Sequence, residues 1–239
     1  MKIIITTALV SLLVSFAVPV WANQSNNLDR NLINNHTMSG FFVSASAGLA
    51  QSKSVYNYSY SNVLYGYNIN TSFPAQNQGA VHLGLGYQFG FGNIDTLKNF
   101  YTGMSVNYNN YGKVVDPLTS KVVKKGSKKG TILSTNYMQL NTINFEGFIG
   151  MHFASPVSAQ IGLGVGNKLG NQQNFGWFGL FNAQIGYNLT KHLQLYLRYT
   201  HAVLVKDSVD LPALCFWVAS SSESQIRINS EQIGLKYIF

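Results

Sequence analysis

The sequence predicts an all-β protein, an eight-stranded antiparallel up-and-down transmembrane β-barrel, and three observations support this. Eight short segments alternate apolar and polar residues, and no apolar run after the N-terminal one is long enough for a membrane helix. The connections between these segments are alternately short and long, as in bacterial outer-membrane barrels. Low charge (10% of residues) and abundant aromatic residues (15 Phe and 14 Tyr) are also more typical of strands than of helices.

The first 22 residues predict a secretory signal peptide. Lys2 precedes an apolar run that starts at Ile3, and "VWA" resembles a cleavage site ending at Ala22. The alternative is an N-terminal transmembrane anchor, but the run is near the lower length limit for one and the small residue at its end favours cleavage. Residues 23–39 are then expected to form a polar periplasmic segment, followed by the barrel over residues 40–239.

Charge and cysteine content limit the possible partners. The leader carries one Lys and no acid, so its removal lowers the formal net charge from +8 to +7. A basic secreted chain suits anionic lipid head groups or polysaccharide, and we expect no nucleic-acid partner. The single Cys215 excludes an internal disulfide framework, so the fold itself must supply the stability.

The first four predicted strands carry apolar residues at every second position. Residues 40–50 (GFFVSASAGLA) and 80–89 (AVHLGLGYQF) place them at odd numbers, mainly against Ser, Gly and His. Residues 100–108 (FYTGMSVNY) place them at even numbers, against Tyr, Gly, Ser and Asn. Residues 142–153 (TINFEGFIGMHF) return to odd numbers, with Asn, Glu, Gly and His opposite. Alternation of this kind predicts strands with two different faces.

The last four predicted strands keep their apolar residues at odd numbers. They are residues 157–166 (VSAQIGLGVG), 181–189 (FNAQIGYNL), 193–201 (LQLYLRYTH) and 233–239 (IGLKYIF). Short turns are predicted at residues 91–99, 154–156 and 190–192, and longer loops at residues 51–78, 109–135, 167–175 and 202–227. An even number of strands returns both termini to the side of the short turns, which is the periplasm in an outer-membrane barrel.

The apolar face of these strands is predicted to face lipid. Gly and Ser concentrate on the polar face, as expected where eight strands enclose an interior only just wide enough for side chains. Aromatic residues gather towards the two ends of the strands, as expected at two lipid–water interfaces. The predicted periplasmic belt is Phe41, Tyr87, Phe89, Phe100, Phe153, Tyr187, Tyr237 and Phe239, and the opposite belt is Tyr108, Tyr137, Trp177 and Tyr199.

Two stretches resemble a known family, the small eight-stranded outer-membrane barrels of the OmpA transmembrane domain, OmpX and opacity-protein type. They are "GYNLTKHLQLYLRYTH", similar to that family's penultimate hairpin, and the terminal "GLKYIF". Together with the strand–loop layout, the resemblance covers Gly40–Phe239 and implies a monomer in the bacterial outer membrane, with both termini periplasmic. It also implies that Tyr237 and Phe239 are part of the signal read by the outer-membrane assembly machinery.

Catalytic motifs are mostly absent from the sequence. It contains no H-E-x-x-H, no G-x-S-x-G and no paired Cys. His201 is followed by Ala202 and Val203, so the His-x-Ser pattern of barrel enzymes that trim lipid A lacks its nucleophile. The chain is therefore predicted not to be an enzyme and to use no cofactor and no metal. A lipid A-modifying barrel enzyme remains an alternative, as does a narrow pore for ions or small solutes.

Three charged residues are predicted to point into the barrel: Glu146, Arg198 and Lys236. Unpaired charges in a narrow interior cost several kcal/mol, so these side chains must pair or meet water. They are predicted to form a polar network that plugs the barrel. The alternative is a gate or selectivity ring of a narrow pore.

The loops carry the remaining candidate residues. A basic loop patch is formed by Lys113, Lys121, Lys124, Lys125, Lys128 and Lys129. It is either a solvated loop or a docking site for lipopolysaccharide phosphates, host polyanions or another envelope component. A loop aromatic surface is formed by Tyr56, Tyr58, Tyr60, Tyr65 and Tyr67. Its alternation predicts a hairpin above the membrane that could bind sugar or protein.

The apolar segment Leu211–Ala219, which contains Cys215, is predicted to lie at the barrel rim, in the lipid interface or against a partner. Together these features predict a structural or interaction protein of the outer membrane. It would act in envelope integrity or surface adhesion through its long loops.

Overall fold

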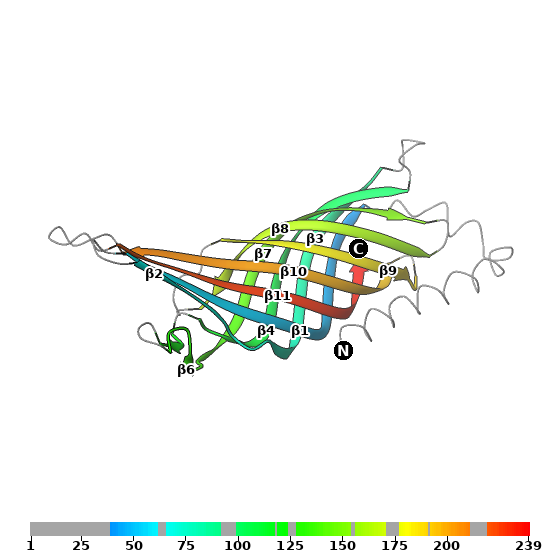
Figure 1. The fold of residues 1–239 in the computed structure, drawn as a ribbon. Coiled ribbons are helices and arrows are strands. Elements are labelled where there is room, and N and C mark those ends of the chain that lie inside the picture. Colours follow the sequence, from blue (N-terminus) through cyan, green and yellow to red (C-terminus); the bar gives the residue numbers. More distant parts are fainter. Residues whose placement is uncertain are drawn as a thin grey trace.

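Eight strands close into an antiparallel barrel in the computed structural model, which describes residues 39–61, 66–91, 99–117, 119–123, 128–153, 156–170, 177–190, 192–210 and 219–239 (Figure 1). The strands of the ring are β1 (Gly40–Ser61), β3 (Gln76–Gly90), β4 (Phe100–Val115), β7 (Tyr137–His152), β8 (Val157–Leu169), β9 (Phe178–Asn188), β10 (Leu193–Asp210) and β11 (Ala219–Ile238). Each pairs with the next, and β11 pairs with β1 to close the ring. The predicted fold class is confirmed. The predicted signal peptide and residues 23–38 of the polar segment lie outside the described residues.

Three short strands supplement the ring. β2 (Gly66–Ser72) pairs with the upper part of β1, and β5 (Lys121–Val122) pairs with β6 (Ile132–Ser134) in a small separate hairpin. In the described part of the chain, no helix is long and apolar enough to cross a membrane.

The two ends of the barrel differ. Connections join β3 to β4, β7 to β8 and β9 to β10 at one end, which we call the short-turn end. Phe42 pairs with Ile238 there, so the first and last strands of the barrel begin and finish at this end. The opposite end, the long-loop end, carries the other connections. The predicted layout holds only in part: the β7–β8 and β9–β10 connections have four residues each, but the nine-residue β3–β4 connection is no shorter than the eight-residue connections that precede β9 and β11.

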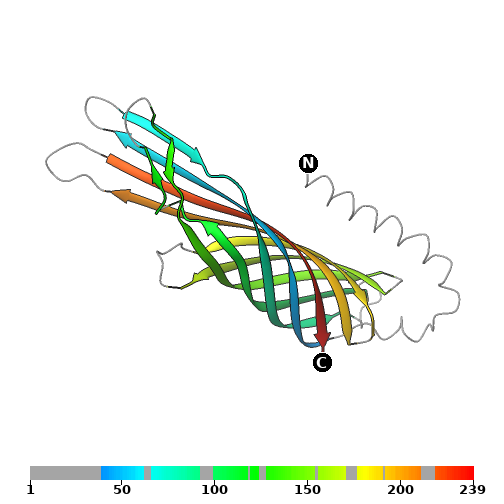
Figure 2. The ribbon, with the colours of Figure 1, turned by 90° about the horizontal axis from the view of Figure 1, so that it is seen from below.

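At the long-loop end, four strands continue past the barrel as a projecting sheet in the order β2-β1-β11-β10. Pairing of β1 with β3 ends at Ser52, and pairing of β10 with β9 ends at Val203, whereas β1 and β11 stay paired up to Ser61. Both views show this sheet extending away from the ring (Figures 1 and 2). The predicted loops over residues 51–78 and 202–227 are therefore wrong for much of their length, because they continue as strands.

The hydrophobic pattern inverts along β11, one of the strands that form this projection. In the lower half of β11, Ile233 and Leu235 are exposed on the outside while Lys236 is buried inside. Higher on the same strand, Ile226 and Ile228 are 0% exposed, and the residues facing outward are polar. The apolar face turns towards whichever medium is not water. The inversion therefore marks where the outer surface passes from lipid to water.

A bulge in β4 lets its upper end contribute to the inside of the barrel. The register between β4 and β7 shifts between Asn110 and Lys113, and Gly112 at the shift has a φ of +74°. Glycine adopts this left-handed conformation without the clash that a Cβ introduces. The extra residue changes the alternation, so Tyr111 and Val114 both face inward and Lys113 faces outward.

Candidate functional site

The middle of the barrel interior is a polar layer centred on an ion pair between Arg198 of β10 and Glu146 of β7. The Arg198 Nη2 atom lies 2.6 Å from Oε1 and 2.7 Å from Oε2 of Glu146. Asn144 donates to Oε1 at 2.6 Å, and Asn182 donates to Oε2 at 2.9 Å. Both charged side chains are buried, at 6% and 2% exposed. The carboxylate therefore has donors on both oxygens, as a buried charge requires.

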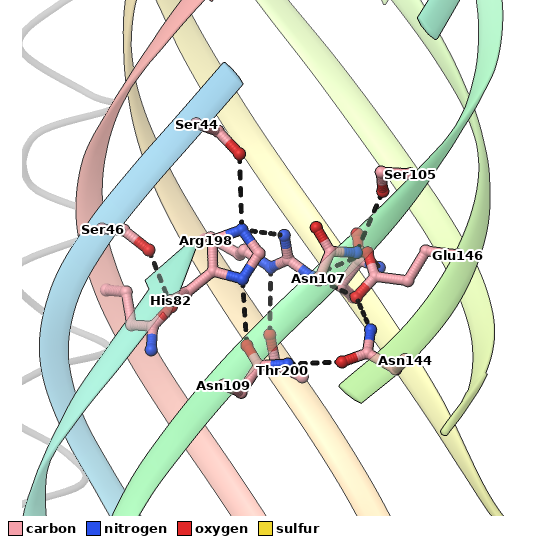
Figure 3. A network of polar contacts seen from close by, with 12 residues as sticks. Ser44, Ser46, His82, Ser105, Asn107, Asn109, Asn144, Glu146, Arg198 and Thr200 are labelled. Atoms are coloured by element: carbon pink, nitrogen blue, oxygen red, sulfur yellow. Dashed lines mark hydrogen bonds and ion pairs between the residues drawn. The ribbon is translucent and has the colours of Figure 1, made fainter. Parts of the chain in front are cut away.

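His82 of β3 connects this ion pair to the other side of the barrel (Figure 3). The guanidinium Nη1 of Arg198 lies 3.1 Å from His82 Nε2, and His82 Nδ1 lies 2.9 Å from the Oδ1 of Asn109. Because the guanidinium can only donate, Nε2 accepts and Nδ1 carries the proton that is donated to Asn109. Arg198 Nε also donates to Thr200 at 3.2 Å. The network thus spans strands that are far apart in the sequence.

Glycine and serine on the inward face make room for these larger side chains. A Cβ on Gly84 would lie 2.5 Å from Asn107 Oδ1 and 2.6 Å from Ser44 Oγ. A Cβ on Gly164 would lie 2.8 Å from Cγ of Glu146. The small residues that the sequence places on the polar face are therefore a packing requirement of the filled interior.

Lys236 of β11 lies in a separate aromatic layer towards the short-turn end. Its Nζ atom is 4.1 Å from the ring centroid of Phe42 and 5.3 Å from that of Phe148, and it donates to Gln88 Oε1 at 2.7 Å. The faces of these rings attract the cation electrostatically. Of the three charged residues predicted to share one network, the structure pairs two and stabilises Lys236 in this different way.

The upper interior, next to the long-loop end, is an apolar layer. Six of its members are at most 1% exposed and have large or branched side chains: Tyr111, Val114, Leu140, Leu204, Ile226 and Ile228. The prediction of a polar interior is wrong for this part of the barrel. Here the outer surface already faces water, so the inner face of the sheet becomes its hydrophobic core. The aromatic, polar and apolar layers together occupy the barrel from one end to the other.

The outer surface carries an aromatic belt at the short-turn end. Phe41 packs edge-on against Tyr87 with ring centroids 4.9 Å apart, and Tyr237 packs against Phe239 at 5.1 Å. The backbone N–H of Phe239 donates to the Phe41 carbonyl at 2.9 Å. The last residue is thereby tied to the first strand. The role of Tyr237 and Phe239 as an assembly signal stays a prediction.

Tyrosines line the inner face of the projecting sheet. Tyr56, Tyr58 and Tyr60 of β1 are on the same face as Tyr67 of β2. Tyr60 and Tyr67 stack with centroids 5.2 Å apart, and burial, together with nearby tyrosine hydroxyls, raises the pKa of Tyr58 above its usual value. The hairpin predicted from this alternation is present. Tyr65 lies outside the described residues.

The β5–β6 hairpin of the second loop packs on this inner face. Its Val122 and Ile132 contact a cluster formed by Tyr56, Phe73 and Val115. Thr71 of β2 donates to the carbonyl of Gly130 at 3.1 Å. The projecting sheet thus holds the second loop in position. The sequence alone did not indicate this contact.

The basic loop patch is divided by the structure. Lys121, Lys128 and Lys129 lie on or beside the β5–β6 hairpin and are exposed, and Lys129 Nζ lies 5.9 Å from the ring centroid of Tyr67. Lys113 instead faces outward from β4, where it pairs with Gln139 of β7. Lys124 and Lys125 lie outside the described residues. Lys129 therefore lies beside the tyrosines of the projecting sheet, and Lys121 and Lys128 are exposed on or beside the same hairpin.

The remaining candidates are His201, residues that could hold a metal ion, and the apolar segment around Cys215. His201 Nδ1 lies 2.7 Å from Asn229 Oδ1, which also accepts from Tyr199 at 3.0 Å. Within the ranges given above, no group of three or more His, Cys, Asp or Glu residues could hold a metal ion. Cys215 and residues 211–218 of the apolar segment lie outside the described residues.

Comparisons with known proteins add a likeness of overall shape. No protein-family description and no curated protein matches the chain. Among solved structures, Neisserial surface protein A is 16% identical, with a TM-score of 0.47, 84% of this chain covered and 98% of that one. OprG from Pseudomonas aeruginosa is 11% identical (TM-score 0.44; 87% and 100% covered). The outer membrane protease OmpT from Escherichia coli is 9% identical (TM-score 0.38; 90% and 100% covered).

Proposed function

We propose that this chain is a bacterial outer-membrane barrel protein that acts at the cell surface by contact, in envelope integrity or adhesion. The short-turn end and both ends of the barrel sequence face the periplasm, and the projecting sheet faces the outside. The observation that carries the proposal is the combination of a filled barrel with an ordered sheet that extends beyond it. A filled interior transports nothing, whereas an ordered, exposed surface is suited to binding.

The interior supports this role over that of a narrow pore. Water cannot reach the apolar layer, in which Leu204, Ile226 and Ile228 are each 0% exposed. An ion crossing that layer would lose its hydration without gaining ligands, which is prohibitively unfavourable. The Glu146–Arg198 pair beneath it is fully engaged with neighbouring side chains and therefore serves as a structural element.

The surface formed by the tyrosines and the β5–β6 hairpin suits an anionic polysaccharide. Lys128 and Lys129 are exposed cations, and Lys129 lies beside the stacked rings of Tyr60 and Tyr67. Tyrosine offers a large contact area for little loss of conformational entropy, and the lysines supply the charge that attracts sulfate or carboxylate groups. Such a polymer belongs either to a host surface or to the bacterial envelope.

Heparin binding by the purified protein in detergent tests this proposal. The double variant Lys128→Ala/Lys129→Ala should bind immobilised heparin about tenfold more weakly, and binding by the unmodified protein should fall as salt rises. Lys113→Ala is the matched control, because that cation faces outward from β4 and should contribute little. Equal binding by the double variant and the unmodified protein would refute the assignment of this surface.

A further inference from the structure

Two cations lie directly opposite each other on the outer surface, away from the surface discussed above. Lys53 of β1 and Arg227 of β11 are cross-strand partners, and both side chains are exposed. In the part of the chain that the structure describes, neither makes an ion pair. Like charges directly opposite on a sheet destabilise it. A ligand of the opposite charge would remove that repulsion.

The inversion of the hydrophobic pattern indicates where this cation pair lies relative to the membrane. On the outer face, the unbroken run of apolar residues at every second position ends at Leu49 on β1 and at Ile233 on β11, and on β1 only Val55 lies beyond it. Lys53 lies four residues beyond Leu49, about 13 Å along the strand and less along the membrane normal because barrel strands are tilted. Long Lys and Arg side chains reach back towards the membrane interface. The two cations therefore lie at the level of the lipid head groups.

Neighbouring side chains orient the donors of this pair. Arg227 donates through Nε to Gln225 Oε1 at 2.9 Å, which leaves its two terminal nitrogens available for a bidentate contact. Two residues below Arg227 on the same strand, Asn229 Oδ1 accepts a hydrogen bond from Tyr199 and lies 2.7 Å from His201 Nδ1. Glu231 lies lower still and is exposed, so it repels an anion that penetrates deeper. The charge pattern thus favours an anion at one depth.

We propose that Lys53 and Arg227 bind the phosphate group of a phosphorylated glycolipid in the outer leaflet of the membrane. The inference rests on the proposed function, because that places the long-loop end at the outer leaflet. Arg227 supplies a planar bidentate donor and Lys53 a point charge, a pair suited to phosphate. Bound lipid would anchor the side of the barrel from which the projecting sheet extends.

Thermal unfolding in lipid nanodiscs tests the proposal. Nanodiscs of phosphatidylcholine would contain either bisphosphorylated lipid A or the same lipid without its phosphates. The phosphorylated lipid should raise the Tm of the unmodified protein, because a ligand that binds only the folded state stabilises it. The double variant Lys53→Gln/Arg227→Gln should need at least about tenfold more lipid for the same shift, whereas Lys113→Gln should respond normally.

Several outcomes would overturn the inference. One is an unchanged response of the double variant, and another is an equal effect of the dephosphorylated lipid. A third is the same shift caused by inorganic phosphate in detergent without lipid, which would show a site for a soluble anion. The double variant should retain heparin binding through Lys128 and Lys129, so failure here is distinguishable from failure of the proposed function.

Discussion

Arg198 is the buried cation at the centre of the polar layer inside the barrel. Its guanidinium donates to Glu146, His82 and Thr200, which belong to three different strands. A buried cation of this kind is tolerated only while its partners remain in place. The residue therefore couples strands that meet only when the barrel closes.

Replacing Glu146 with Gln should destabilise the barrel. The change keeps the size of the side chain but leaves the guanidinium of Arg198 buried without a counter-charge, at an expected cost of about 3 kcal/mol in the free energy of unfolding. Urea unfolding in detergent micelles measures this cost. Combining Glu146→Gln with Arg198→Met should cost less than the sum of the single changes, and strict additivity would contradict the pairing.

For single residues, the sequence shows whether a side chain points into the barrel, but it does not show which side chains it contacts there. The alternation along each strand correctly places Glu146, Arg198 and Lys236 on the inside. It cannot show that His82 lies beside Arg198 while Lys236 lies among aromatic rings. Those contacts depend on the relative heights of strands around the ring, which the stagger of a closed barrel determines.

Among the elements, β4 shows how a local irregularity changes which residues are enclosed. The bulge at Gly112 reverses the alternation, so that Val114 enters the apolar layer and Lys113 faces outward. Conventional two-residue alternation would have placed Lys113 inside. The bulge therefore keeps a cation out of the hydrophobic part of the barrel.

Gly112→Ala should lower the free energy of unfolding by about 1–2 kcal/mol, because an L-residue is strained at positive φ. The added Cβ would also lie 2.7 Å from Cβ of Gln78. Gly79→Ala is the matched control, since nothing lies within 4 Å of the Cβ it adds, and it should change stability by less than about 0.5 kcal/mol. Equal effects of the two substitutions in urea unfolding would contradict the strain at the bulge.

The sequence predicts that the strands exist more reliably than it predicts the residues at which they end. Strand recognition relied on apolar residues facing lipid, and that signal stops at Leu49 on β1 although the strand continues to Ser61. Beyond the lipid, the inner residues carry the apolar character, as Ile226 and Ile228 do on β11. The same strand thus shows opposite patterns in its two halves, and a search for one pattern finds only one half.

In the whole molecule, the filled interior distinguishes between two roles that a membrane barrel can have, transport through the barrel and binding at its surface, and it favours binding. The aromatic, polar and apolar layers leave the projecting sheet and the outer surface as the places where other molecules can bind. Both proposed sites, the hairpin lysines and the Lys53–Arg227 pair, lie on those surfaces.

The unmodified protein should therefore show no stable conductance steps in a planar lipid bilayer. The apolar layer excludes water, and a dry constriction blocks ions. Protein inserted from detergent and confirmed as folded by its resistance to unfolding in SDS provides the sample. If discrete steps appear and Glu146→Gln changes their size, the interior is a pore, and the contact role loses its main support.

The projecting sheet also determines which kind of epitope an antibody against this protein can recognise. Its strands come from residues 53–61 and 66–72 and from residues 204–210 and 219–227, two parts of the chain that are distant in sequence and adjacent in the folded molecule. An antibody that binds across β1 and β11 recognises a discontinuous epitope, and heating the antigen destroys it. A synthetic peptide from either stretch alone is consequently a poor substitute for the folded surface as an immunogen.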